Sequence, residues 1–227
     1  MSGISFLSLV ILISSIPVIA VIIWFKLKRY SFSTFIISAS FFSGLISFFT
    51  AIFIHIFFDY AGSFISSGRW VVFYKHFIQI AFSEEFSRLL LLVIFYFVIN
   101  KIKKKNYNEA WFCAVGLFSG LGFAVLESAV IGISYSNFTW MRVFTAAPLH
   151  GACGCRVAVS AAKFKNHKAQ SIFRFFSAVA IHGIYNFLIA RDHHLPSQIA
   201  AVLIVFSSLV SSIMTINRGM GSKDGTN

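Results

Sequence analysis

The sequence predicts an all-α, polytopic membrane protein, a bundle of about seven transmembrane helices that forms a single transmembrane domain. Hydrophobic residues make up 58% of the 227 residues, charged residues only 11%, and the mean hydropathy is +0.82. Soluble domains carry about a quarter charged residues. Seven apolar spans of about 20 residues fit this length. The composition excludes a water-soluble enzyme, and three cysteines are too few for a secreted disulfide scaffold.

Each predicted helix is bounded by the polar residues where an apolar run stops. The first run lacks a basic leader and a small-residue cleavage site, so we expect a retained helix that ends at Lys26. The second run ends at a loop with Gly and Ser over 59–69, and the third at a lysine cluster that begins with Lys101. We expect helices at about 4–25, 32–58, 71–99, 110–133, 142–162, 171–190 and 197–216, the catalytic helices at 71–190, and a short cytoplasmic tail at 217–227.

The distribution of basic residues predicts the orientation in the cell membrane. The loops after the first, third and fifth helices and the C-terminal tail hold 12 basic residues, and the other loops hold three. Because Lys and Arg are retained on the cytoplasmic side, we predict an external N-terminus and a cytoplasmic C-terminus. The net charge of +12 therefore reflects membrane orientation, and we expect no nucleic acid among the partners.

Charged residues inside the predicted helices are the first functional signal. Three of the seven acidic residues lie deep in apolar runs: Glu84 and Glu85 on the third helix and Glu127 on the fourth. Charge in the bilayer is costly and indicates function by default. Arg88 follows the glutamate pair at helical spacing and can neutralise part of its charge. A single Glu–Arg pair could be purely structural, so further polar groups decide the interpretation.

Those groups follow on the next helices, with His150 on the fifth and His182 and Asn186 on one face of the sixth. At about 1.5 Å per residue, Glu127, His150 and His182 lie roughly 9–13 Å from the outer ends of their helices, and Glu84 lies roughly 20 Å from its own. We therefore expect a polar cluster in the outer half of the bilayer. Four other histidines and the paired cysteines are interpreted as interfacial, solvated or packing residues: His55 with Asp59, His167, His193, His194, Cys153 and Cys155.

These motifs together resemble a known family. Glu84-Glu85-x-x-Arg88, Phe123-x-x-x-Glu127, His150 and His182-x-x-x-Asn186, in this order on successive helices, are similar to the PrsW family of intramembrane proteases. The plan is also similar to that of the CAAX prenyl endopeptidase and Abi superfamily. PrsW proteins commonly have Lys where this chain has Arg88, and Asp where it has Asn186. The resemblance implies a protease that cleaves a membrane-anchored protein, such as an anti-sigma-factor-like regulator.

Peptide hydrolysis requires an activated water, an oxyanion donor and a proton donor for the leaving amine. We expect Glu84 to act as the base, Glu85 as its partner and Arg88 to limit the cost of burying them. The two histidines would position water and substrate, and Glu127 would orient one of them. Asn186 suits the oxyanion role that the CAAX-type relatives assign to that position.

Two alternatives use the same atoms. Glu127, His150 and His182 form a zinc ligand set of the kind found in thermolysin, with the glutamate pair acting on metal-bound water. No cofactor is favoured by the sequence, zinc is possible, and we expect activity without a tightly bound metal. A proton-coupled transporter or channel would also use buried Glu and His residues. Broken helices and repeated halves, which often mark transporters, are not visible.

Overall fold

The structure, a computed structural model, describes residues 3–65, 68–103, 107–134, 139–190 and 195–221. Helices make up almost all of this part of the chain, and it contains no strand. This confirms the predicted all-α class. The helices are α1 (Gly3–Ser14), α2 (Ile16–Leu27), α3 (Thr34–Gly62), α4 (Gly68–Phe73), the π-helix η1 (Tyr74–Phe82), α5 (Ser83–Lys103), α6 (Glu109–Ser134), α7 (Thr139–Lys163), α8 (Lys168–Ile189) and α9 (Leu195–Met220).

Two of the predicted helices are subdivided. The first consists of α1 and α2, which meet at Ser15 just before Pro17, a residue that lacks an amide hydrogen and interrupts a helix. The third consists of α4, η1 and α5, which follow one another without a break. Three helices continue about one turn past their predicted ends: α3 to Gly62 into the predicted loop, α5 to Lys103 into the lysine cluster, and α9 to Met220 into the predicted tail.

Five helical segments among the described residues are long and apolar enough to cross a membrane, which confirms a helical membrane bundle. They are Ser8–Leu27, Thr34–Gly62, Glu109–Ile131, Lys168–Ile189 and Leu195–Met220. The two other long helices, α5 and α7, are those that carry Glu84, Glu85, Arg88 and His150. Charged and polar residues make these two helices less uniformly apolar than the other five segments.

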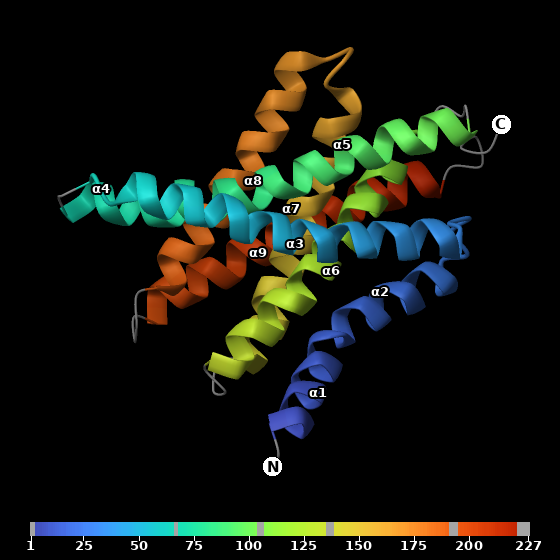
Figure 1. Ribbon diagram of the computed structural model, residues 1–227. Coiled ribbons are helices and arrows are strands. Elements are labelled where there is room, and N and C mark those ends of the chain that lie inside the picture. Colours follow the sequence, from blue (N-terminus) through green and yellow to red (C-terminus); the bar gives the residue numbers. More distant parts are fainter. Residues whose placement is uncertain (1–2, 66–67, 104–106, 135–138, 191–194, 222–227) are drawn as a thin grey trace.

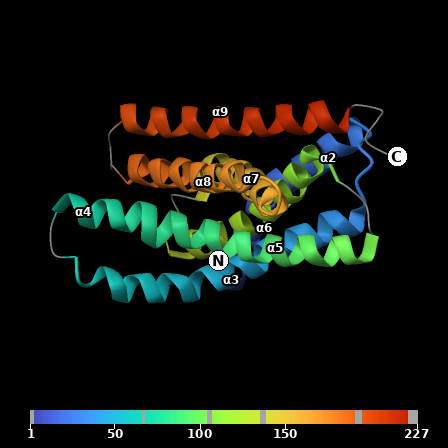
Figure 2. The same cartoon turned by 90° about the horizontal axis from the view of Figure 1, so that it is seen from above.

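Helices α6 and α7 form the centre of the bundle. Figure 2 shows α6 and α7 between α9 on one side and α3 and α5 on the other. The apolar span of α6 is 83% buried, whereas α3 and α9 are 22% and 28% buried and present large apolar side chains such as Phe53 and Leu203 outward. In a bilayer these outward faces contact lipid.

Small residues allow the two central helices to approach closely. A Cβ atom added at Gly120 of α6 would overlap the carbonyl oxygen of His150 on α7, and one at Gly116 would overlap that of Gly154. Small residues spaced by four permit this contact in membrane helices. The close approach holds the backbone of His150 directly against Gly120 of α6. Gly120 lies about two turns before Glu127 on that helix.

The helix ends alternate between two sides of the molecule. In Figure 1 the ends of α2, α5 and α9 lie toward the right, whereas α4, the end of α8 and the start of α9 lie toward the left. The first group carries basic residues such as Lys26, Lys101 and Arg218.

Candidate active site

Four helices bring the predicted polar residues into one buried cluster. Glu84, Glu85 and Arg88 come from α5, Glu127 from α6, His150 from α7 and His182 from α8, and all six are buried. The sequence spacing between the first and last of them is almost 100 residues. Only the packing of the helices joins them, and the cluster has the ionisable groups that acid–base or metal chemistry requires.

Glu85 is the anchor of this cluster. Its Oε2 accepts a hydrogen bond from Nη1 of Arg88, and its Oε1 accepts one from Nδ1 of His182 at 2.8 Å. The side chains of Glu85 and Arg88 are both 0% exposed. Since the Nδ1 proton is donated to Glu85, the Nε2 atom of His182 carries the free lone pair. That atom lies 3.7 Å from Oε2 of Glu84.

His150 lies between Glu127 and Arg88 and contacts both. Its Nε2 lies 2.7 Å from Oε2 of Glu127, and its Nδ1 lies 3.2 Å from Nη2 of Arg88. Arginine can only donate hydrogen bonds, so Nδ1 of His150 accepts and Nε2 donates to Glu127. The Arg88 guanidinium also lies over the ring of Phe123 at 4.8 Å from its centroid, which accounts for Phe123 in the motif.

A cavity of about 510 Å³ borders the cluster on one side. Its polar lining is His55, His76, Glu84, Glu127 and Asn186, and the rest is apolar. The side chains of Glu84 and Glu127 are 8% and 11% exposed, whereas that of Glu85 is fully enclosed. Glu84 and Glu127 are therefore the two carboxylates that a molecule in the cavity would meet.

The π-helix η1 leads directly into the glutamate pair and shapes this wall of the cavity. Ser83 closes η1 by donating its hydroxyl to the carbonyl oxygens of Gln79 and Ile80, at 2.5 and 3.0 Å. Gly183 of α8 lies against the ring of Phe77, where any larger residue would collide with it. This contact brings His182, the preceding residue, beside η1 and the start of α5. Short π-helical segments are frequent at functional sites.

Three residues offer ligand atoms for a metal ion. One atom each from Glu84, His150 and His182 lies within 4.8 Å of the other two. The zinc set expected from the sequence had Glu127 in place of Glu84. Two histidines and a glutamate suit zinc by donor type. Nε2 of His182 is ready to bind because Glu85 fixes the ring, as carboxylates commonly do for metal-binding histidines. His150 would have to release Arg88 from Nδ1 or Glu127 from Nε2.

Other residues singled out in the sequence have different positions. His55 lines the cavity and is therefore not a purely interfacial residue, while Asp59 accepts a hydrogen bond from Gln79 at 2.9 Å. Cys153 and Cys155 are buried free thiols. His193 and His194 lie outside the described residues. His76, which the sequence analysis missed, had one detectable signal, since it lies two helical turns before Glu84.

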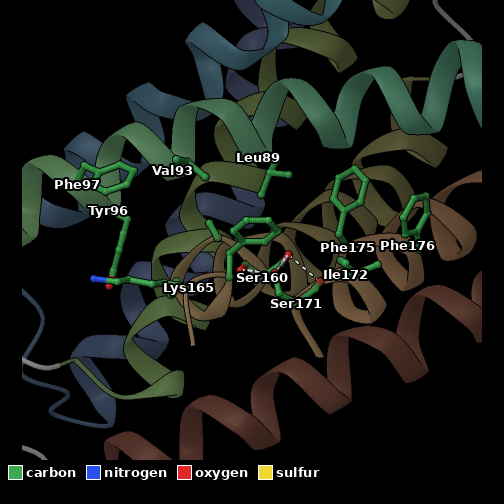
Figure 3. A pocket seen from close by; sticks show the side chains of 13 residues that line it. Leu89, Val93, Tyr96, Phe97, Ser160, Lys165, Ser171, Ile172, Phe175 and Phe176 are labelled. Atoms are coloured by element: carbon green, nitrogen blue, oxygen red, sulfur yellow. Dashed lines mark hydrogen bonds between the residues drawn. The ribbon is translucent and has the colours of Figure 1, made fainter. Parts of the chain in front are cut away.

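A second cavity, of about 350 Å³, lies between α5, α7 and α8. Figure 3 shows Phe175, Phe176 and Ile172 at one end of it and Tyr96, Phe97 and Lys165 toward the other. No residue of the cluster described above lines it. Its lining is almost entirely apolar and lacks the groups needed for hydrolysis.

The description "PrsW family intramembrane metalloprotease" belongs to a family whose sequence model matches residues 32–213. The match covers most of the chain and includes every residue of the cluster and the cavity. It confirms the resemblance drawn from the motifs. Comparisons with curated proteins and with solved structures give no match.

Proposed function

The chain belongs to the PrsW family of intramembrane metalloproteases, and from this premise we propose that it hydrolyses a peptide bond of a membrane-anchored protein at the cluster of Glu84, Glu127, His150 and His182. The observation that supports this assignment most directly is the meeting of these four side chains from four helices beside a cavity. Buried carboxylates and histidines next to a cavity are the usual form of a hydrolytic site.

The family description and the donor set support a metal-dependent reaction over the metal-free one. Glu84, His150 and His182 would hold the ion, and zinc is the metal that this combination of ligands suits best. When bound, such an ion supplies Lewis-acid polarisation and makes water a better nucleophile. Glu84 is then a ligand, and the base role expected for it passes to another carboxylate.

Glu127 is that carboxylate. Its side chain borders the cavity, and its Oε2 accepts a hydrogen bond from Nε2 of His150. A carboxylate in this position can take a proton from the attacking water and return it to the leaving amine. Glu85 and Arg88 have a positioning role. Glu85 holds the ring of His182 by Nδ1. Arg88 contacts Nδ1 of His150 in the structure and would release this nitrogen to the ion, and neither Glu85 nor Arg88 lines the cavity.

Asn186 is the proposed oxyanion donor. Its Nδ2 is buried, lies in the wall of the cavity and has no hydrogen-bond partner among the described residues. A side-chain amide in this state is available for the negative oxygen that develops on the scissile carbonyl. Asp, which is common at this position in the family, could not donate such a bond when ionised.

Part of the cavity lining lies near the helix ends opposite the basic clusters. This part includes Ile189 and Ala190 at the end of α8 and Ile131 near the end of α6, far from Lys101 and Lys168. With an external N-terminus and a cytoplasmic C-terminus, cleavage takes place in the outer half of the bilayer or just outside it.

The test is cleavage of a tagged single-pass membrane protein co-expressed with the wild-type chain or with Glu127→Gln. We expect processing by the wild type and a loss of roughly 10²–10⁴-fold without the base. The family match does not favour the alternative of proton-coupled transport. Proton flux in proteoliposomes, without cleavage of any tagged protein, would contradict the protease.

A further inference from the structure

Two histidines outside the catalytic cluster have buried ring nitrogens with no hydrogen-bond partner among the described residues. The atoms are Nε2 of His55 on α3 and Nδ1 of His76 on η1. A buried polar group without a partner costs free energy, and native proteins keep few of them. The cost is higher in a bilayer, where water does not replace the missing partner. Both atoms therefore require an explanation.

Both residues line the cavity that holds Glu84, Glu127 and Asn186. They come from two elements that contribute nothing else to the chemistry, α3 and η1, and so lie on a part of the wall distinct from α6 and α8. The apolar part of the same wall includes Phe48, Ile52 and Phe123. The cavity thus combines apolar surface with isolated hydrogen-bonding groups.

This combination fits a stretch of polypeptide that has left the helical conformation. A transmembrane helix satisfies its backbone groups internally, and this also shields its carbonyl carbons from attack. Once a segment unwinds, its carbonyl and amide groups lose their partners at a depth where water is scarce. A neutral histidine has one donor nitrogen and one acceptor nitrogen. The ring of His55 is already hydrogen-bonded to the backbone of Ile80, so its Nε2 can accept a hydrogen bond from a freed backbone amide, while Nδ1 of His76 can replace one lost bond of either kind.

We infer that His55 and His76 form a subsite that binds the backbone of an unwound, apolar segment of a membrane protein next to the scissile bond. The inference rests on the proposed function and names the form in which that substrate is recognised. Phe48, Ile52 and Phe123 would contact its apolar side chains. A continuous transmembrane helix, whose backbone groups are already hydrogen-bonded, would not be bound more tightly because of the two histidines.

The experiment compares two labelled synthetic peptides of one leucine- and alanine-rich span each. One has a central Gly-Pro pair, which breaks the helix and frees backbone carbonyl and amide groups, and the other has Ala-Ala there. Binding is measured to the full chain in phosphatidylcholine nanodiscs, in a Glu84→Gln background that suppresses turnover. His55→Phe and His76→Phe are the test variants, His55→Gln restores hydrogen bonding, and His167→Phe, an exposed histidine away from the cavity, is the matched control.

We expect the Gly-Pro peptide to bind more tightly than the Ala-Ala peptide. Each His→Phe change should weaken binding of the Gly-Pro peptide by roughly threefold to tenfold and leave binding of the Ala-Ala peptide unchanged. His55→Gln and His167→Phe should behave like the parent. Equal binding of the two peptides to the parent, unchanged binding by both Phe variants, or a parallel loss for both peptides would overturn the inference.

Failure of the proposed function has a different signature. If the Glu84→Gln parent protein still cleaves the peptides, the proposed role of Glu84 is refuted. This result does not depend on how the histidine variants bind. A selective effect of His55→Phe and His76→Phe on binding would remain, because binding is measured without turnover.

Discussion

Replacing Glu85 by Gln is expected to destabilise the bundle and not only inactivate it, because Glu85 is the carboxylate that neutralises Arg88. Both side chains are fully buried and form an ion pair, and Glu85 also accepts a hydrogen bond from His182. Removal of one partner from a buried pair costs about 3–5 kcal/mol, because the other charge remains without compensation. Native proteins have total stabilities of only about 5–15 kcal/mol. A large part of the stability would be lost.

Glu84→Gln is the matched control, since it makes the same chemical change at the adjacent position. Glu84 borders the cavity, whereas Glu85 forms the enclosed ion pair with Arg88. The Glu84→Gln variant should accumulate in the membrane at the wild-type level while cleavage is lost. The double variant Glu85→Gln/Arg88→Met removes both charges and should recover much of the lost protein without recovering activity.

The assay measures the membrane-integrated protein level and the thermal unfolding temperature in detergent, together with cleavage of the tagged single-pass protein. We expect Glu85→Gln to reduce level and unfolding temperature, and Glu84→Gln to leave both unchanged. Wild-type level and unfolding temperature for Glu85→Gln would refute the reasoning. So would an equal loss for the two variants, because it would show that Arg88 depends on both glutamates.

Four further outcomes are expected. Elemental analysis of active, purified protein should find about one zinc per chain and much less in Glu84→Gln; activity without metal would restore the metal-free mechanism. Asn186→Ala should lower kcat by roughly 10²–10³-fold at unchanged protein level, as loss of an oxyanion donor does, and a change in KM alone would contradict that role. Gly120→Ala should reduce the unfolding temperature because its methyl group would meet the carbonyl oxygen of His150, and a stable, active variant would show that α6 and α7 can separate there. Reporter fusions after Lys168 should read as cytoplasmic and those after Asn137 as external, and the opposite pattern would invert the orientation.

The sequence alone determined the class of fold and the residues with chemical potential. Spans of about 20 apolar residues can bury their backbone in lipid only as helices, so hydropathy is sufficient to predict the bundle. Ionisable groups such as Glu84, Glu127 and His182 stand out against that apolar background because burial of charge is costly. The order of these residues along the chain was enough to indicate the family.

Only the tertiary structure decided which of these groups pair. Helical spacing allowed Arg88 to reach either glutamate, and the structure joins it to Glu85 and His150 and leaves Glu84 at the cavity. The sequence grouped Glu127 with the histidines as ligands, whereas Glu84 is the carboxylate with a ligand atom within 4.8 Å of one on each histidine. His55 gave no sign in the sequence that it shares a cavity with the catalytic residues, and His76 showed only its position two helical turns before Glu84.

The physical reason is that periodicity and hydropathy describe one helix at a time. They fix which residues share a face, but the rotation and depth of a helix relative to its neighbours depend on contacts between helices. In this protein those contacts are made by small residues, such as Gly120 against His150 and Gly183 against Phe77. A shift of a single turn moves a side chain by about 5.4 Å, which is more than the separation of the ligand atoms in the cluster.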